Sequence, residues 1–444
     1  MILTMKPSRP LSRRLLQAAV ACVLCSAGAA QAQLGLPRLN LPQTLGQPGL
    51  ETLVRPAERL LDRAVPGEIE GLRLGQVSEL LRRHRDLLEA DPRGEPVVRR
   101  ELLATSPPPA VLREAARLGF ELVREQSFEE LGESLVVLRA PSGMSTAEAL
   151  ARLRALDPQT SFDFNHVYLG GGALAPLDGA EQADSGNSGA AAPGAVGLID
   201  SGVDTAHPVF DGARIEQFGC NGKLHPAPHG TAVAALMVGR AERFRGAAPG
   251  IRLYAADIYC DSPTGGSADK VAAALAWMSK QRVGVVNLSL VGPDNATLGR
   301  MVAALVARGH LLVAAVGNDG PAAPPLYPAS YPGVVGVSGV DRQGRPLPEA
   351  ARGPQVMFAA PGSQMVSAAP GTPPYRQVRG TSFAAPLVAA LLAPALPRPD
   401  REGAQRALAA LARQAVRADA NAVSNALGHG VVGAALRVDP GRFR

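Results

Sequence analysis

The 444-residue chain is poor in lysine and in aromatic residues, and both shortages narrow its function. Only four of its 45 basic residues are lysines, and no stretch combines dense basic residues with interleaved aromatics, as nucleic-acid-binding surfaces do. Ten phenylalanines, six tyrosines and one tryptophan leave Ala, Val and Leu to fill most of the core. We therefore expect no nucleic-acid partner, although the net charge is +6.

Long hydrophobic runs are also missing, and the one apolar stretch near the N terminus is shorter than a membrane span requires. Residues 1–32 are typical of a secretion signal. Basic residues from Lys6 to Arg14 precede the apolar run Leu15–Ala30, and Ala30-Gln31-Ala32 supplies a cleavage site with small residues. Ser12-Arg13-Arg14-Leu15-Leu16 leaves a twin-arginine signal open as an alternative. We expect an exported protein, secreted or periplasmic, without a stable membrane anchor.

Cysteine is scarce too. Cys22 and Cys25 lie in the signal, so the exported chain keeps only Cys220 and Cys260. In an oxidising compartment we expect these two to form a disulfide, with two buried free thiols as the alternative.

The chain divides into segments of different pattern. Residues 33–96 are rich in Leu, Pro and Arg and contain one amphipathic stretch, 77–90, that predicts a helix; the role of this extension is not predicted. Residues 97–168 predict the order β-α-β-β-α-β of a small ferredoxin-like α+β plait, with Ser145 and Glu148 as a capping box. Residues 169–194 are rich in Gly, Ala, Ser and Asp, which predicts a flexible linker.

Strands and helices alternate through residues 195–444. This rhythm predicts an α/β fold, a parallel doubly wound sheet with helices on both faces. Expected buried strands span 195–199, 252–259, 284–290, 311–316 and 334–340. Expected helices span 229–240, 267–280, 296–307, 382–392 and 401–417.

Four polar residues lie at boundaries of these elements. Asp200 ends the first strand, His229 opens a helix and Ser382 begins another; Asn318 follows the fourth strand. Each alone is compatible with a turn or a helix cap. Together they supply a hydroxyl, an imidazole to take its proton, a carboxylate to orient the imidazole, and an amide donor for an oxyanion. The order Asp, His, Asn, Ser in a parallel sheet favours nucleophilic serine catalysis.

These motifs make residues 195–436 resemble the subtilisin-like serine protease family, the subtilases. The resemblance implies a serine endopeptidase that acts through an acyl-enzyme, with Asp200, His229 and Ser382 as its triad. Asn318 and the Ser382 backbone N–H would form the oxyanion hole. Further stretches resemble the family's later motif blocks: Val286-Asn287-Leu288-Ser289, Tyr327-Pro328-Ala329, Ala359-Ala360-Pro361-Gly362 and Gly428-His429-Gly430-Val431-Val432.

The resemblance also implies a substrate-binding set: Ser289, Leu290, Val291, Gly292, Ala315, Val316, Gly317 and Leu326. Two of these depart from the family pattern, because Val291 and Leu326 stand where family members often have glycine. Both side chains would crowd the subsite for the residue before the scissile bond. We therefore expect a preference for small residues there.

Subtilases are often made with a propeptide of plait topology that assists folding and then inhibits. Phe164-Asn165-His166-Val167-Tyr168 resembles the end of such a propeptide, which implies self-cleavage within 168–194; the alternative is a linker that is never cut. Residues 33–192 carry 17 basic and 23 acidic residues (net −6) and residues 193–444 carry 24 and 16 (net +8), which suits docking of one part on the other.

The expected partners are therefore protein or peptide substrates and the chain's own propeptide, and we expect a monomer. The alternative function is a catalytically silent binding protein with its propeptide still docked. Metalloprotease and α/β-hydrolase motifs are missing, so no metal or cofactor is expected for catalysis. Structural calcium occurs in the family, but no carboxylate cluster in this sequence supports it.

Overall fold

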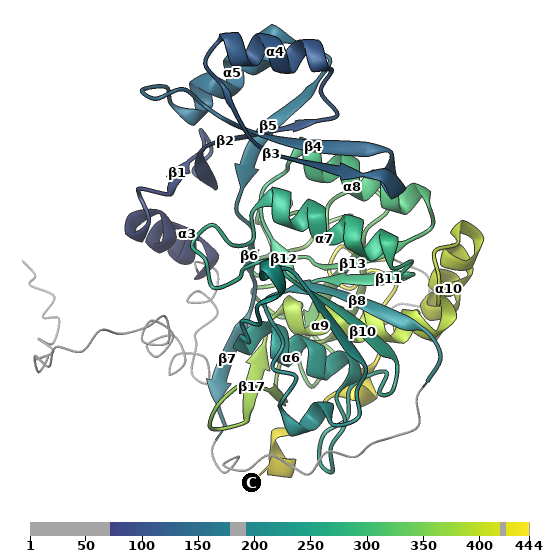
Figure 1. Cartoon of the computed structure of the whole chain (residues 1–444). Coiled ribbons are helices and arrows are strands. Elements are labelled where there is room, and N and C mark those ends of the chain that lie inside the picture. The colour runs from purple at the N-terminus through teal and green to yellow at the C-terminus, as the bar shows by residue number, and fades with distance from the viewer. Residues whose placement is uncertain (1–71, 178–191, 418–422, 444) are drawn as a thin grey trace, which may run out of the picture. The chain divides into compact units, whose positions relative to one another are not determined.

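The computed structural model describes residues 72–177, 192–417 and 423–443 (Figure 1). The predicted signal, 1–32, and the first part of the N-terminal extension lie outside the described residues.

The centre of the fold is a seven-stranded, fully parallel sheet in the order β15-β14-β13-β11-β8-β10-β9. The predicted fold class is confirmed, and the five expected strands are present. The edge strands β9 and β15 were not predicted, and β9 has only four residues with two exposed side chains, so it lacks an apolar run. The strands are β8 (Ala195–Asp200), β9 (Ile215–Phe218), β10 (Arg252–Asp257), β11 (Val285–Leu288), β13 (Leu311–Ala315), β14 (Val335–Val340) and β15 (Val356–Pro361).

Helices cover both faces of this sheet (Figure 1). Helices α6 (Pro228–Val238) and α9 (Thr381–Leu392) pack together on one face, where the largest apolar cluster lies. Helices α7 (Ala268–Lys280) and α8 (Ala296–Ala307) cover the other. Buried Ala and Val are frequent in both clusters, because few aromatics are available and small side chains let helices approach the strands closely. Helix α10 (Arg401–Gln414) completes the predicted set.

The predicted plait is present between residues 96 and 166, and we call these residues the plait module. Ser145 Oγ accepts a hydrogen bond from Glu148 N, as a capping residue should. One face of the antiparallel plait sheet carries α4 and α5 on a small core, and the other face packs against α7 and α8. The elements are β2 (Pro96–Thr105), α4 (Pro109–Arg117), β3 (Glu121–Phe128), β4 (Glu133–Arg139), α5 (Thr146–Leu156) and β5 (Ser161–His166).

Two predictions of local structure were wrong. The helix expected over 77–90 is helix α3 (Leu72–Arg83) followed by strand β1 (Leu88–Ala90). Pairing of β1 with β2 buries Leu88 opposite Val98, and this tertiary contact overrides the helical pattern.

The expected flexible linker is also partly wrong. Its first residues form strands β6 (Leu169–Gly170) and β7 (Ala173–Pro176). β6 pairs with β12 (Leu290–Val291), and β7 pairs with β17 (Tyr375–Arg379), which in turn pairs with β16 (Met365–Ala368). The remainder of the predicted linker, from residue 178 to 191, lies outside the described residues.

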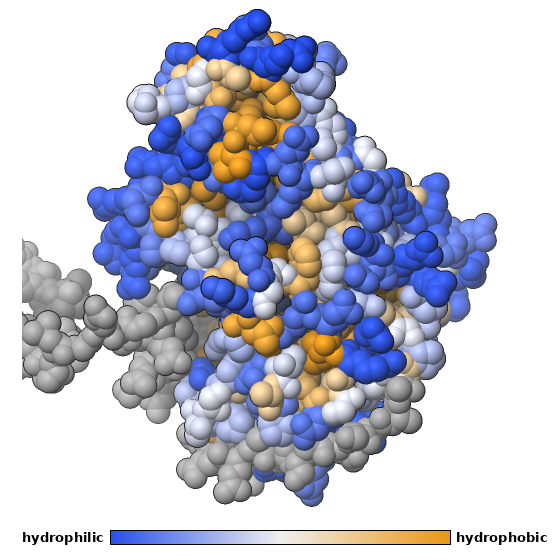
Figure 2. All heavy atoms as spheres, in the orientation of Figure 1, coloured by the Kyte–Doolittle hydropathy of each residue, from blue (hydrophilic) through white to orange (hydrophobic). Residues whose placement is uncertain are grey.

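Apolar residues on the face shown in Figure 2 lie in separate groups within a largely hydrophilic surface, one of them over the plait module. Among the described residues, large exposed apolar side chains are scattered over several elements, and single exposed residues of this kind are ordinary. They include Leu74 on α3, Leu122 on β3 and Phe218 on β9.

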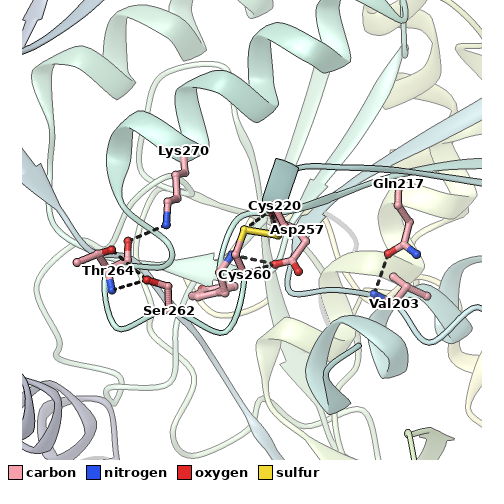
Figure 3. The surroundings of a disulfide bond; sticks show 9 residues. Val203, Gln217, Cys220, Asp257, Cys260, Ser262, Thr264 and Lys270 are labelled. Carbon is pink, nitrogen blue, oxygen red and sulfur yellow. Dashed lines mark hydrogen bonds between the residues drawn. A yellow bond between two sulfur atoms is a disulfide. The ribbon is translucent and has the colours of Figure 1, made fainter. Parts of the chain in front are cut away.

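The structure contains the Cys220–Cys260 disulfide that the sequence predicts (Figure 3). Cys260 lies just beyond β10, where Asp257 Oδ1 accepts hydrogen bonds from the N–H groups of Tyr259 and Cys260. Cys220, Asp257 and Cys260 bring three potential metal ligands together, but the two sulfurs are bonded to each other. The bridge therefore serves to anchor the loop 259–266.

We expect loss of this disulfide to destabilise the protein. The bond closes a loop with a sequence separation of 40 residues, which limits the entropy of the unfolded chain. Replacing both Cys220 and Cys260 with serine should lower the free energy of unfolding by about 2–4 kcal/mol. Denaturant unfolding of the two forms measures this, and equal midpoints and slopes would contradict it.

Candidate active site

Asp200 and His229 form a hydrogen-bonded pair in which the carboxylate is buried and the imidazole is partly exposed. Asp200 lies at the carboxyl end of β8, and His229 is the second residue of α6, directly after Pro228 at the position where proline suits a helix start. His229 Nδ1 lies 2.8 and 3.0 Å from the two carboxylate oxygens of Asp200. Asp200 Oδ1 also accepts hydrogen bonds from the backbone N–H and hydroxyl of Ser201, which hold the carboxylate in place.

Ser382 is the second residue of α9, so its hydroxyl lies at the positive end of a helix dipole. Its Oγ is buried and has no hydrogen-bond partner among the described residues. The backbone carbonyl of Ser382 accepts a hydrogen bond of 2.8 Å from Ser289 Oγ. Ser289, expected to bind substrate, thus contacts the serine's own backbone.

Asn318 follows β13 and faces the start of α9. Its Oδ1 accepts a hydrogen bond of 3.0 Å from Thr381 N, which fixes the orientation of the amide group. The amide nitrogen Nδ2 is therefore free to point toward the cleft. Thr381 Oγ1 also accepts a hydrogen bond from Gly317 N, so two bonds join this loop to α9.

The chain's own residues 169–176 run through this site. Strand β6 pairs with β12 upstream, and β7 pairs with β17 downstream. Gly171 lies between the two strands, and a Cβ atom added to it would be 3.0 Å from Ser382 Oγ and 3.3 Å from Asn318 Nδ2. The structure therefore places one peptide group, the one joining Gly171 to Gly172, beside three of the four predicted catalytic residues, Ser382, Asn318 and His229, while Asp200 contacts the other ring nitrogen of His229.

The carbonyl of Gly171 is bonded to His229. His229 Nε2 lies 2.9 Å from Gly171 O, and because a carbonyl only accepts, this contact is a hydrogen bond when Nε2 carries a proton. Nδ1 lies within hydrogen-bond distance of Asp200, so the doubly protonated imidazolium is the form that can donate to both partners. The pKa of His229 reflects this: burial works to lower it, but the charge of Asp200 and the hydrogen bonds to Asp200 and Gly171 outweigh burial and raise it.

Tyr168 anchors the segment upstream of Gly171. Its side chain is fully buried, its hydroxyl donates to Pro293 O at 2.8 Å, and its N–H donates to Gly266 O at 2.8 Å. Its ring lies against Gly292, where an added Cβ would approach within 2.5 Å. Gly266 belongs to the loop that the disulfide anchors.

The structure brings most of the predicted substrate-binding residues to this segment. Leu290 and Val291 form β12, and Gly292 contacts Tyr168. Gly317 and Leu326 lie behind Val291, because a Cβ on Gly317 would be 2.6 Å from Leu326 Cδ1 and 3.7 Å from Val291 Cγ1. Ala315 and Val316 are buried within and just after β13. Their binding role remains a prediction.

Sequence reasoning missed a contact between the N-terminal extension and this site. Arg73 on α3 donates to Asp319, next to Asn318, at 2.6 Å and forms two further bonds with Glu95. Burial alone would lower the pKa of Arg73, but these carboxylates raise it. A small cavity between α3 and the cleft is lined by Leu72, Arg73, Gln76, Gly170, Gly171, Gly172, Ala173, Val291, Asn318, Asp319, Glu349, Arg379 and Gly380.

The parallel sheet, with these side chains beyond the carboxyl ends of its strands, defines the class of subtilisin-like α/β proteins. The chain belongs to the subtilase family, because the sequence model of that family matches residues 194–430. It is 32% identical to Subtilisin from Bacillus pumilus over 204 residues, which cover 44% of this chain and 73% of that protein.

Other similar proteins agree on the fold. The chain is 30% identical over 204 residues to Subtilisin E from Bacillus subtilis (strain 168), covering 44% of this chain and only 53% of that relative's length. The crystal structure of fervidolysin from Fervidobacterium pennivorans superposes with a TM-score of 0.64 at 19% identity, covering 79% of this chain and 62% of that one, and shows a shared fold.

We expect cleavage of the seated segment to be strongly pH-dependent. A general base must be neutral, and the pKa of His229 is raised above the ordinary value of 6.5, so the imidazolium persists to higher pH. The rate of self-cleavage should rise with pH, about tenfold per unit on the acid side, with half its maximum above pH 6.5. Time courses of the full chain between pH 5 and 9 measure this. A rate that is flat or falls over this range would contradict it.

Proposed function

We propose that the chain is the precursor of an exported serine endopeptidase that cleaves itself between Gly171 and Gly172. The observation that carries this proposal is the seating of Gly171 beside Ser382, His229 and Asn318. Membership of the subtilase family supports peptide-bond hydrolysis as the reaction. Protein or peptide segments that bind along β12 and β17 as residues 169–176 do would be the substrates in trans.

The reaction needs one rearrangement of the seated segment. The Gly171 carbonyl must leave His229 Nε2 and turn toward Asn318 Nδ2 and the Ser382 N–H. Two glycines flank this peptide, and Gly172 has φ of +108°, a conformation that glycine adopts without strain. A rotation of this single peptide group therefore suffices and leaves the flanking strands in place.

The bonds then change in two stages. Ser382 Oγ attacks the Gly171 carbonyl carbon while neutral His229 takes the hydroxyl proton, and the oxyanion receives hydrogen bonds from Asn318 and the Ser382 N–H. His229 gives the proton to the nitrogen of Gly172, the peptide bond breaks, and Gly171 remains as an ester on Ser382. Water, deprotonated by His229, hydrolyses the ester and restores the serine.

Residues up to Gly171 would then act as the propeptide. The plait module packs Phe128, Leu131 and Leu135 onto the apolar surface of α7 and α8. Asp163 Oδ2 accepts a hydrogen bond of 2.6 Å from Ala296 N at the start of α8. Arg124 pairs with Asp269 at 2.6 Å, and Glu133 pairs with Arg300 at 3.0 Å. In one ion pair the plait module supplies the basic residue, Arg124, and in the other it supplies the acidic residue, Glu133. The net charges of the two parts therefore explain this docking less than apolar packing and helix capping do.

Export rests on the sequence of the predicted signal, residues 1–32. In the part of the chain that the structure describes, no helix has both the length and the apolar character needed to cross a membrane.

The alternative, a silent binding protein with its propeptide docked, is compatible with the bond between His229 and the Gly171 carbonyl. It predicts a precursor that stays whole.

Expression of the chain from Gln33, with Ser382 or with Ser382→Ala, separates the two functions. We expect only the serine form to acquire a new N terminus at Gly172, seen by sequencing and intact mass over time. If both forms fold and stay whole, self-processing fails, and the result favours the silent function or activation by another protease. If both are cut alike, another protease is responsible.

We also expect α3 to act as a latch that prolongs inhibition after the cut. Removing one partner of a mostly buried charge pair costs several kcal/mol, which would weaken the contact between α3 and the cleft. After self-cleavage, the Arg73→Ala variant should therefore gain activity on casein at least about tenfold faster than the wild type, when each rate is divided by the rate of self-cleavage of the same protein. Arg82→Ala is the matched control, because Arg82 is 62% exposed and, among the described residues, its ion pair is with Glu79 of its own helix. Equal effects of the two variants would contradict the latch.

A further inference from the structure

We propose that the site cleaves after glycine and excludes larger residues from that position, with Val291 and Leu326 imposing this selectivity. The inference rests on the proposed function and names its substrate class: exposed protein segments in which a glycine precedes the scissile bond.

The space around the Cα atom of Gly171 leaves almost no room for a side chain. An added Cβ would lie 3.0 Å from Ser382 Oγ and 3.3 Å from Asn318 Nδ2, closer than such atoms normally approach. Both neighbours belong to the predicted catalytic set and cannot retreat without losing their positions. Alanine would therefore be strained at this place, and a longer side chain would need a pocket beyond the Cβ.

That pocket is filled. Val291 Cγ2 lies 4.0 Å from the added Cβ, and Val291 Cγ1 lies 3.7 Å from a Cβ on Gly317, so this one side chain spans the space between the two glycines. Leu326 closes the space from behind, at 2.6 Å from the same Cβ on Gly317. Both side chains are buried, with Val291 3% and Leu326 5% exposed.

The backbone fixes both side chains. Gly292 N donates to Tyr327 O and Tyr327 N donates to Gly292 O, each at 2.9 Å. These two bonds join the residue after Val291 to the residue after Leu326. The backbone segments that carry the two side chains are therefore joined, and both side chains are buried, so a large residue on the substrate would have to displace packed atoms.

The neighbouring glycine provides a comparison within the same segment. A Cβ on Gly170 would lie 3.6 Å from His229 Nδ1, which is ordinary van der Waals contact. The space around Gly170 thus accepts alanine, whereas the space around Gly171 does not. The restriction therefore spares Gly170 and falls on Gly171 and on Gly172, where an added Cβ would lie 2.8 Å from Phe383 Cε2.

The test follows self-cleavage of the full chain by intact mass and N-terminal sequencing. Gly171→Leu should slow the cut at this bond at least about 100-fold, because an overpacked, rigid site costs a few kcal/mol. The same substitution combined with Val291→Gly and Leu326→Gly should be cut within about tenfold of the wild-type rate, since the pocket is then open. Gly171→Ala should slow cleavage more than Gly170→Ala does.

Each outcome decides the matter. Cleavage of Gly171→Leu at the wild-type rate, or no recovery in the opened pocket, overturns the proposal. A Ser382-dependent cut elsewhere in the wild-type chain overturns it too, but leaves the proposed function intact. No Ser382-dependent cut in the wild type is a failure of the proposed function itself. Thermal unfolding of each variant in the Ser382→Ala background shows whether lost cleavage reflects lost folding.

Discussion

Strand pairing on both sides of Gly171 is the interaction on which the rest of the site depends. β12 holds the two residues before Gly171 and β17 holds the four after Gly172, so backbone hydrogen bonds fix the height of the segment above Ser382. Backbone pairing does not depend on side-chain identity. Side chains on the segment are therefore limited at the few places where they would meet the walls: a Cβ on Gly171 would lie 3.0 Å from Ser382 Oγ, and a Cβ on Gly172 would lie 2.8 Å from Phe383 Cε2.

The same pairing explains why a low-complexity stretch becomes ordered. Gly, Ala and Pro between residues 169 and 177 offer little surface to bury, which is typical of a linker. The free edges of β12 and β17 supply the partners that the segment lacks in itself. Tyr168 at one end and Leu177 at the other are both buried, and they anchor the extended chain between them.

The fold was predictable from the sequence to a large extent because its signals are local. Buried parallel strands are continuous apolar runs, and the helices between them begin and end at clear boundaries, so β8, α8 and α9 were expected within about a residue. The four polar residues at strand and helix ends were predictable for the same reason, since parallel strands present their carboxyl ends at one edge.

The remaining features depend on contacts between distant residues. Leu88 belongs to a strand only because β2 lies beside it, and Arg73 lies beside Asp319 only because α3 packs next to the cleft. Gly171 and Ser382 are 211 positions apart, and no local pattern marks the glycine between its two neighbours as the residue at the serine. A stretch of three glycines predicts flexibility, whereas its position in the cleft requires the smallest side chain.

The hydrogen bond from His229 to Gly171 has two effects: it holds residues 169–176 in the cleft, and it keeps His229 from acting as a base. It adds a charge-assisted bond to the seated segment, because the imidazolium is paired with Asp200 on its other side. It also keeps the proton on the nitrogen that must accept one from Ser382, and keeps the carbonyl away from Asn318. The imidazolium form of His229 thus holds the segment in an arrangement in which His229 cannot act as a base. The self-cleavage that we propose requires loss of that proton and rotation of one peptide group between two glycines, a small motion that leaves both strand pairs intact.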